Sequence, residues 1–374
     1  MSYWHRDAFS GETLSQPLKP KLFIPGPTHV DDEILHAMGE YPVGHRSSAF
    51  SELYDEVVEG IKKVIFTQNR VFLGTCSATG LMEAAVRNTV ERRCANFICG
   101  AFSKRWYEIT RACGIHCDYF EVDPGRAIKP EMVHKLLETG RYDVLTIVHN
   151  ETSTGVMNPI AEIAEIVNEF EDILLLVDMV SSMASVKVDV DNLGIDVALA
   201  SVQKGWGLPP GFAVCSVSDR AFERSGRVKN KGYYFDFQVM ERYALKSQTP
   251  TTPSLPHMYA LRCQLNRIFR EGLDNRFQRH KSMAKRVRAW AKKDFDLFAE
   301  KGFESDTVTC VENTMGINIS DMLSRLLKKA YMISGGYGPL KGQTFRIAHM
   351  GDLQLSDIEE LLSAIDETIE EMKA

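Results

Sequence analysis

The chain has 374 residues, of which 44% are hydrophobic and 25% are charged, and its formal net charge is −6 at pH 7. This length exceeds what a single hydrophobic core usually holds, so we expect two lobes. The mild negative charge argues against a nucleic-acid-binding surface, no apolar run approaches the length that spans a membrane, and the start lacks the apolar core of a signal peptide. We therefore expect a soluble cytoplasmic protein with neither nucleic-acid nor membrane partners.

The eight cysteines include no pair of CxxC motifs of the kind that binds zinc. A cytoplasmic chain keeps such cysteines reduced. Cys113 and Cys117 lie close to His116, but without a second ligand cluster this spacing is more typical of a helix end that leads into a strand. We expect no metal site.

Residues 1–20 show no hydrophobic period, and we interpret them as an N-terminal arm. We expect a large domain over residues 21–269 and a small domain over residues 270–374. The charged stretch Pro256–Asp294 is predicted to be a long helix between them, with no obvious break in its early half.

Two prolines bracket Gly26 near the start of the predicted large domain, and they hold the backbone extended or turning. His45 and Arg46 then follow a turn and precede the predicted amphipathic helix Phe50–Val64. The sequence allows either a solvated turn at these two residues or a contact with the substrate or a partner subunit.

A strand, a turn of small residues and an apolar-periodic helix follow over Val71–Val86. Ser77 and Thr79 lie where this helix begins, so free backbone N–H groups and hydroxyls converge there, and the helix dipole favours an anion. An ordinary helix N-cap explains the same residues, because Ser and Thr cap helices in any protein. The residues alone leave both interpretations open.

Short apolar runs alternate with helical periods between Cys94 and Val217. This pattern predicts a mostly parallel sheet covered by helices on both faces, with ligands bound beyond the carboxyl ends of the strands. The predicted strands are Cys94–Cys99, Cys117–Val122, Val144–Val148, Ile173–Val177, Val197–Ala200 and Phe212–Val217.

Two ionisable residues lie at the ends of buried strands. Lys204 follows Val197–Ala200 in a segment rich in Gly and Pro, where desolvation lowers the pKa of a lysine and makes its amine a nucleophile toward carbonyls. Asp178 ends an apolar strand, where a carboxylate is costly unless a partner such as a protonated pyridinium meets it. The pair suits a Schiff base to pyridoxal phosphate, although a single loop lysine is more often merely solvated.

The C-terminal part is predicted to contain strands at Thr307–Cys310 and Gly316–Ile319, then the loop 334–338, whose glycines allow a turn to approach a ligand. Arg346 alternates with two apolar neighbours and so faces the opposite side of its strand, toward the cleft. A guanidinium binds a carboxylate through two parallel hydrogen bonds. An exposed strand arginine is the alternative.

Together these motifs resemble those of the class V (fold type I) pyridoxal-phosphate-dependent aminotransferases, in particular the alanine–glyoxylate and serine–glyoxylate branch. The resemblance is carried by Asp178 with Val180–Ser182, Ser201–Lys204 and Pro209–Gly211. Further matches run nearly end to end, at Pro25–Thr28, Gly44–Ser47, Gly100–Ser103, Asn150–Gly155, Thr249–Pro253 and Thr344–Ile347. The resemblance implies an α/β fold, with a large domain built on a mostly parallel seven-stranded sheet between helices and a smaller C-terminal α+β domain.

The resemblance also implies roles for the matching residues. Lys204 forms the Schiff base and moves the proton of the substrate's Cα, Asp178 pairs with the pyridine nitrogen, and Phe102 stacks on the ring. Gly26 and Arg346 bind the substrate. The other implied cofactor-binding residues are Ser77, Ala78, Thr79, Thr152, Val180, Ser201, Gln203 and, across the interface of a homodimer with shared active sites, Thr252.

One departure concerns the loop Thr249–Pro253, which we call the threonine loop. Thr249 stands where the alanine–glyoxylate enzymes carry a tyrosine, so the residues around the cofactor phosphate are expected to differ in detail.

We expect transamination between a small donor, alanine or serine, and a small 2-oxo acid, glyoxylate or pyruvate. Arg346 is the only guanidinium that motif and strand phase place in the cleft, so a second carboxylate on the donor lacks an assured partner. The alternatives are an aminotransferase for aspartate, phosphoserine or an aminophosphonate, and a cysteine desulfurase-like lyase. A desulfurase needs a nucleophilic cysteine on a mobile loop, whereas Cys310 is predicted to lie in a strand.

Overall fold

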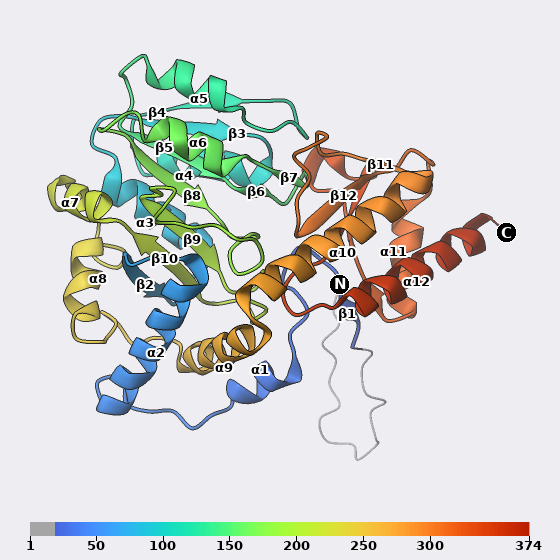
Figure 1. The fold of residues 1–374 in the computed structure, drawn as a ribbon, viewed down its shortest axis with the longest axis horizontal. Coiled ribbons are helices and arrows are strands. Elements are labelled where there is room, and N and C mark those ends of the chain that lie inside the picture. The colour runs from blue at the N-terminus through green and yellow to red at the C-terminus, as the bar shows by residue number, and fades with distance from the viewer. Residues whose placement is uncertain (1–18, 374) are drawn as a thin grey trace.

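The computed structural model describes residues 19–373, so nearly all of the predicted arm over residues 1–20 lies outside the described part. A seven-stranded sheet runs in the order β2-β10-β9-β8-β5-β3-β4 (Figure 1). β10 is antiparallel to both of its neighbours, and the other pairs are parallel. The strands are β2 Arg70–Gly74, β3 Cys94–Ile98, β4 Cys117–Glu121, β5 Val144–Val148, β8 Leu174–Asp178, β9 Val197–Ser201 and β10 Ala213–Val217. The mostly parallel sheet is confirmed, with strand ends within a residue of those predicted.

Helices cover both faces of this sheet. They are α1 Asp32–Ala37, α2 Ser48–Ile65, α3 Ala78–Thr89, α4 Ala101–Ala112, α5 Pro130–Leu137, α6 Ile160–Val167, α7 Asp219–Arg227, α8 Phe237–Ala244 and α9 Leu255–Glu271. Successive strand residues point to opposite sides. Leu145 and Val177 therefore pack with α2, α5, α6 and α9 on one face, and Val144 and Leu176 pack with α3, α4, α7 and α8 on the other.

The C-terminal part contains a four-stranded antiparallel sheet in the order β11-β12-β15-β14. Its elements are α10 Leu273–Asp294, β11 Asp296–Leu297, β12 Val308–Glu312, α11 Ile319–Lys328, β14 Ser334–Gly335, a 3-10 turn at Gly338–Leu340, β15 Thr344–Ala348 and α12 Leu355–Lys373. Phe345 and Ile347 of β15 pack with apolar residues of all three helices. Figure 1 shows this sheet beside the larger one, with α10 running across it.

Short strands join distant segments. β1 Lys21–Leu22 pairs in parallel with β13 Tyr331–Met332, and Phe23 packs in the apolar cluster of the C-terminal part. β6 Asn150–Glu151 and β7 Val156–Met157 form a small hairpin beyond the end of β5. The start of the described chain thus lies against the C-terminal sheet, and the division into domains 21–269 and 270–374 stays a prediction.

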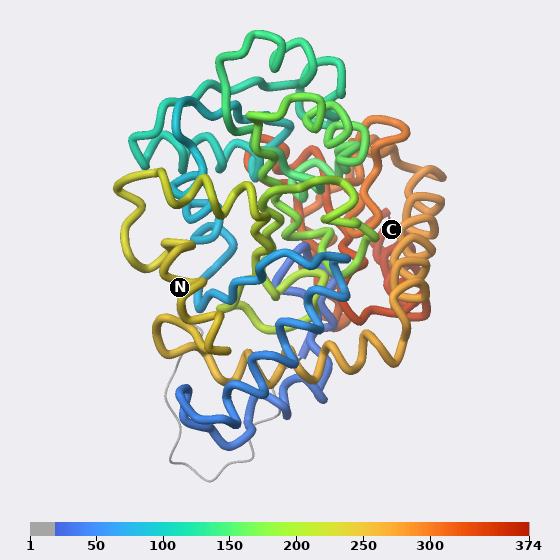
Figure 2. Tube along the Cα trace, turned by 60° about the vertical axis from the view of Figure 1, so that its left-hand side comes forward, coloured from blue at the N-terminus to red at the C-terminus, as the bar shows by residue number. Residues whose placement is uncertain are grey.

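The long helix predicted over Pro256–Asp294 is wrong, because two helices meet at Gly272, whose φ of 85° breaks the helical path. Figure 2 shows the chain turning between α9 and α10.

The strand predicted over Gly316–Ile319 is also wrong. Gly316 has a φ of 66°, and the side chain of Asn313 binds both the N–H and the C=O of Ile317, which makes a turn. Asn318 then caps α11 by accepting a hydrogen bond from the N–H of Asp321. Turn and cap chemistry therefore override the apolar residues of this segment.

None of the helices within residues 19–373 combines the length and the apolar character needed to cross a membrane.

Candidate active site

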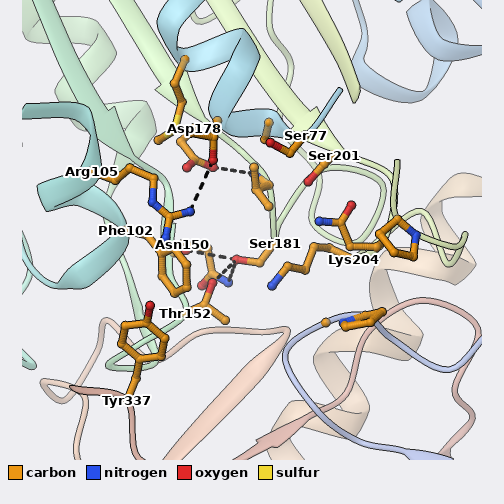
Figure 3. A pocket seen from close by; sticks show the side chains of 18 residues that line it. Ser77, Phe102, Arg105, Asn150, Thr152, Asp178, Ser181, Ser201, Lys204 and Tyr337 are labelled. Carbon is orange, nitrogen blue, oxygen red and sulfur yellow. Dashed lines mark hydrogen bonds between the residues drawn. The ribbon is translucent and has the colours of Figure 1, made fainter. Parts of the chain in front are cut away.

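A cavity of about 310 Å3 lies at the carboxyl edge of the large sheet (Figure 3). Parallel strands end at one edge, so the residues that follow β2, β3, β5, β8 and β9 meet there. The predicted site residues that line this cavity are Gly26, Ser77, Ala78, Thr79, Phe102, Thr152, Asp178, Val180, Ser201, Gln203 and Lys204. Neither Arg346 nor Thr252 lines it, but Arg346 contacts the lining residues Thr152 and Tyr337.

Asp178 is the last residue of β8 and is 5% exposed. Burial raises its pKa to about 7; the N–H of Val180, which donates to Asp178 at 2.7 Å, opposes this shift, as do the charges of Lys204 and Arg105. The carboxylate of Glu151 adds to the upward shift. A buried carboxylate with a single hydrogen bond has room for a cationic partner.

Lys204 lies just past the end of β9, and burial lowers its pKa to about 8. Asp178 raises this pKa, whereas the guanidinium groups of Arg346 and Arg105 lower it. The amine donates a hydrogen bond to the C=O of Pro25. A Cβ at Gly26 would lie 2.6 Å from Cδ of Lys204, so the absence of a side chain there lets the chain pass against the lysine.

Ser77 stands at the N-cap position of α3, but its hydroxyl makes no capping hydrogen bond. The N-cap position is therefore as the ordinary interpretation expected, but the hydroxyl is left without the capping hydrogen bond of that interpretation. The first turn of α3 presents its backbone N–H groups and the hydroxyls of Ser77 and Thr79 to the cavity, which suits an anion.

Arg105, which no sequence motif indicated, also lines the cavity. Its Nη1 donates to Oγ1 of Thr79 at 3.4 Å, and its guanidinium lies 5.1 Å from the centre of the Phe102 ring. Arg105 follows Phe102 by one helical turn, so both share a face of α4, and this spacing was the signal available. The inference that Arg346 is the one guanidinium at the cleft is corrected accordingly.

Phe102 is held by the start of α4. Glu151 is fully buried, and its carboxylate accepts hydrogen bonds from the N–H of Phe102 at 3.2 Å and of Ser103 at 2.9 Å. A Cβ at Gly100 would lie 2.6 Å from Cδ of Glu151. Glu151 thus caps α4 and sets the position of the aromatic ring.

A polar network forms the floor of the cavity. Nδ2 of Asn150 donates to Oγ of Ser181 at 2.8 Å, and the hydroxyls of Thr152 and Ser181 lie 3.0 Å apart. Figure 3 shows these side chains between Phe102 and Lys204. Asn150 and Ser181 lie inside motifs that carry the family resemblance, but no feature of those motifs distinguishes them from their neighbours.

Arg346 is 8% exposed, so the alternative of an exposed strand arginine is wrong. Its Nε donates to the C=O of Gly335 at 3.1 Å, and its Nη1 donates to the C=O of Thr152 at 3.3 Å. Nη2 has no hydrogen-bond partner within residues 19–373. The guanidinium lies 5.6 Å from the ring of Tyr337, another lining residue that the sequence did not indicate.

Arg46 is an exposed turn residue, as one of the two interpretations expected, and it does not line the cavity. It donates to the C=O of Thr249 at 2.8 Å and to Oε1 of Gln248 at 3.1 Å, and so holds the threonine loop. His45 does not line the cavity either, and Thr252 is exposed in that loop.

A half-buried lysine and a buried aspartate in one cavity at the carboxyl edge of a mostly parallel sheet define an α/β enzyme with a candidate nucleophilic amine. Residues 22–337 match the family described as aminotransferase class-V. The chain belongs to this family and is an aminotransferase.

The chain is 37% identical to an uncharacterized aminotransferase of Methanocaldococcus jannaschii, over 95% of this chain and 94% of the relative. It is 33% identical to a serine–glyoxylate aminotransferase of Methylorubrum extorquens, over 90% of this chain and 88% of the relative. The crystal structure of an alanine–glyoxylate aminotransferase from Nostoc sp. superposes with a TM-score of 0.89 at 30% identity, covering 96% of this chain and 98% of that one.

The pKa of Lys204 can be measured in the cofactor-free protein. Because burial lowers this pKa to about 8, we expect acetylation of Lys204 to rise through an apparent pKa near 8. Asp178→Asn should shift this value downward, since the carboxylate of Asp178 raises the pKa of Lys204. Peptide mass spectrometry over a pH series gives the rate, with the exposed Lys301 as internal reference. Identical profiles for the two lysines would contradict the prediction.

Proposed function

We propose that this aminotransferase uses pyridoxal 5′-phosphate to move the amino group of a small amino acid, alanine or serine, to glyoxylate or pyruvate. The observation that carries the proposal is the placement of half-buried Lys204 and buried Asp178 in one cavity, with an uncapped helix N-terminus at Ser77 on its wall. These are the groups needed for the aldehyde, the ring nitrogen and the phosphate of the cofactor.

The residues present fit this cofactor. Phe102 offers a flat apolar surface for the ring, and the first turn of α3 offers N–H groups for the phosphate. Oε1 of Gln203 is buried without a hydrogen-bond partner in the described part of the chain, so it has capacity for a polar edge of the ring. Thr152, Val180 and Ser201 complete the proposed cofactor contacts.

When bound, pyridoxal phosphate supplies a carbonyl that takes up the amino group and a ring that withdraws electrons from Cα. Asp178 would hold a positive charge at the ring nitrogen, because its buried carboxylate is stabilised by a cation. Lys204 would hold the cofactor at its aldehyde carbon, and its free amine would move the proton of the substrate's Cα. Its pKa of about 8 leaves roughly a tenth of the amine unprotonated at pH 7, far more than for an ordinary lysine.

Arg346 orients the substrate. Two of its nitrogens are held by the C=O groups of Gly335 and Thr152, which leaves Nη2 for the substrate's α-carboxylate. Gly26 brings backbone close to Lys204 on the other side of the amine. The substrate's Cα is thereby kept near the lysine.

We further propose a homodimer in which Thr252 reaches the cofactor phosphate of the partner subunit. Thr252 is exposed and does not line the cavity of its own chain. Arg46 holds the backbone of its loop at Thr249, so the loop is fixed where a second subunit can meet it.

We also propose that the enzyme works in the cytoplasm without membrane or nucleic-acid partners. All eight cysteines are unpaired, which suits a reducing compartment.

Two alternative activities have less support from the structure. In a desulfurase, a cysteine on a mobile loop attacks the substrate, but Cys310 lies within β12 and burial raises its pKa to about 11. An aspartate, phosphoserine or aminophosphonate donor has one observation in its favour, because Arg105 is a second cation at the cavity. Arg105 donates to Thr79 in the anion-binding turn, so we assign it to the cofactor's side of the cavity.

Lys204→Ala should lower transamination by more than about a thousandfold, because the variant has no amine to move the proton. The thermal unfolding temperature should change little, since the side chain lies in the cavity and not in an apolar cluster. The exposed Lys187→Ala is the matched control and should keep full activity. Substantial steady-state turnover by purified Lys204→Ala would exclude the assigned role.

Subunit mixing tests the shared site. In a heterodimer of Lys204→Ala with a Thr252→Glu chain that has lost cofactor affinity, one site combines the intact lysine with the intact threonine of the other chain. We expect this heterodimer to recover about half of the wild-type activity. Each homodimer serves as its own control. Heterodimers of verified composition that stay inactive would assign Thr252 to its own subunit's site.

A donor panel tests the substrate. We expect alanine or serine to exceed aspartate and glutamate by roughly a hundredfold in kcat/KM, because a second carboxylate lacks a partner on the donor's side. The half-reaction is followed by loss of cofactor absorbance. A preference for dicarboxylic donors that disappears selectively in Arg105→Gln would reverse the assignment of Arg105.

A further inference from the structure

One arginine that does not line the cavity contacts the loops behind it. Arg276 lies in the first turn of α10, directly after the break at Gly272, and is 1% exposed. A guanidinium so deeply buried is costly unless its charge and its five N–H donors find partners. The partners of Arg276 therefore show what its burial stabilises.

Two partners are backbone carbonyls beyond neighbouring strands of the large sheet. Nε of Arg276 donates to the C=O of Ala184 at 2.8 Å, in the loop that follows β8 and Asp178. Nη2 donates to the C=O of Gly205 at 2.9 Å, directly after Lys204. The two loops touch, because a Cβ at Gly205 would lie 2.3 Å from the C=O of Met183.

The third partner belongs to the C-terminal part. Nη1 donates to Oδ1 of Asp352 at 3.0 Å, and Asp352 lies in the loop that follows β15, the strand of Arg346. This loop also packs on the lysine segment, since a Cβ at Gly351 would lie 3.6 Å from the C=O of Lys204. Nη1 donates in addition to Oε2 of Glu271 at 3.1 Å, at the end of α9.

We infer that Arg276 is a positioning residue that fixes Lys204, Asp178 and Arg346 relative to one another by tying the three loops that follow their strands. Its planar, rigid fork of donors suits this role, because it meets acceptors in several directions at once. A lysine at the same position keeps the charge but cannot donate hydrogen bonds to all of these acceptors at once. The inference rests on the proposed function in that it takes these three residues as the working groups.

Arg276→Lys tests the inference in two ways. In the holoenzyme, turnover per bound cofactor should fall by roughly tenfold or more, because a displaced Lys204 is poorly aligned for proton transfer. The KM of the donor should also rise several-fold, because the variant loses the link to Asp352 in the loop behind Arg346. In the cofactor-free protein, the apparent pKa of Lys204 from its acetylation profile should rise, because a loosened loop admits water to the amine. Asp178, Arg105 and Arg346, which also set this pKa, are unchanged in the variant.

Arg286→Lys is the matched control, because Arg286 lies on the same helix and pairs with Glu359 of α12 without touching the three loops. It should leave both readouts unchanged. A folded Arg276→Lys protein with wild-type turnover per cofactor and a wild-type Lys204 profile would overturn the inference, even if its unfolding temperature is lower.

If Arg276→Lys does not fold, Asp352→Asn provides a second test of the inference. It weakens the link to the loop behind Arg346 but leaves the carbonyl contacts at Ala184 and Gly205, so the KM of the donor should rise several-fold while the Lys204 profile stays unchanged. An unchanged KM would overturn the link to Arg346. The acetylation profile does not depend on transamination, so it still tests Arg276 if the proposed function fails.

Discussion

The carboxyl edge of the parallel sheet is the constraint on which the rest of the site depends. Because β5, β8 and β9 run in the same direction, Thr152, Asp178 and Lys204 emerge at one edge although they are far apart in the chain. The turn after β2 and the start of α4 reach the same edge and add an anion-binding helix end and an aromatic ring. The functional groups therefore come from several loops, and a buried strand of the sheet anchors each loop.

Burial then changes the acid–base chemistry of the groups at this edge. The pKa of Asp178 is raised to about 7 and that of Lys204 is lowered to about 8, in both cases mainly by desolvation. Within the described residues no ion pair joins them, so neither carries a fully compensated charge. A cation at Asp178 and a carbonyl at Lys204 relieve these costs, which links the stability of the site to the ligand that we propose.

Glycines allow the surrounding segments to approach so closely. Gly26 lies against the side chain of Lys204, Gly100 against Glu151, and Gly205 against the loop after Asp178. A side chain at any of the three positions would collide with its neighbour. The same close packing lets Arg276 reach two loops of the large sheet and one loop of the C-terminal part with a single guanidinium.

The sequence by itself determined the strands of the large sheet, and with them Asp178 and Lys204 at strand ends and Ser77 at a helix start. These features depend on short apolar runs and on turn residues next to them, which are local properties of the chain. The phase of β15 also placed Arg346 on the side away from its apolar neighbours.

Only the tertiary structure decided which other residues join Asp178, Lys204 and Arg346 at the site. Arg105 and Tyr337 line the cavity, Arg46 holds the threonine loop, and Arg276 ties the loops together, although each looks like an ordinary charged or aromatic residue in its own segment. The break at Gly272 depends likewise on a backbone conformation that the helical period around it does not reveal. These contacts join segments far apart in the chain, and a local pattern of apolar and polar residues carries no information about such distances.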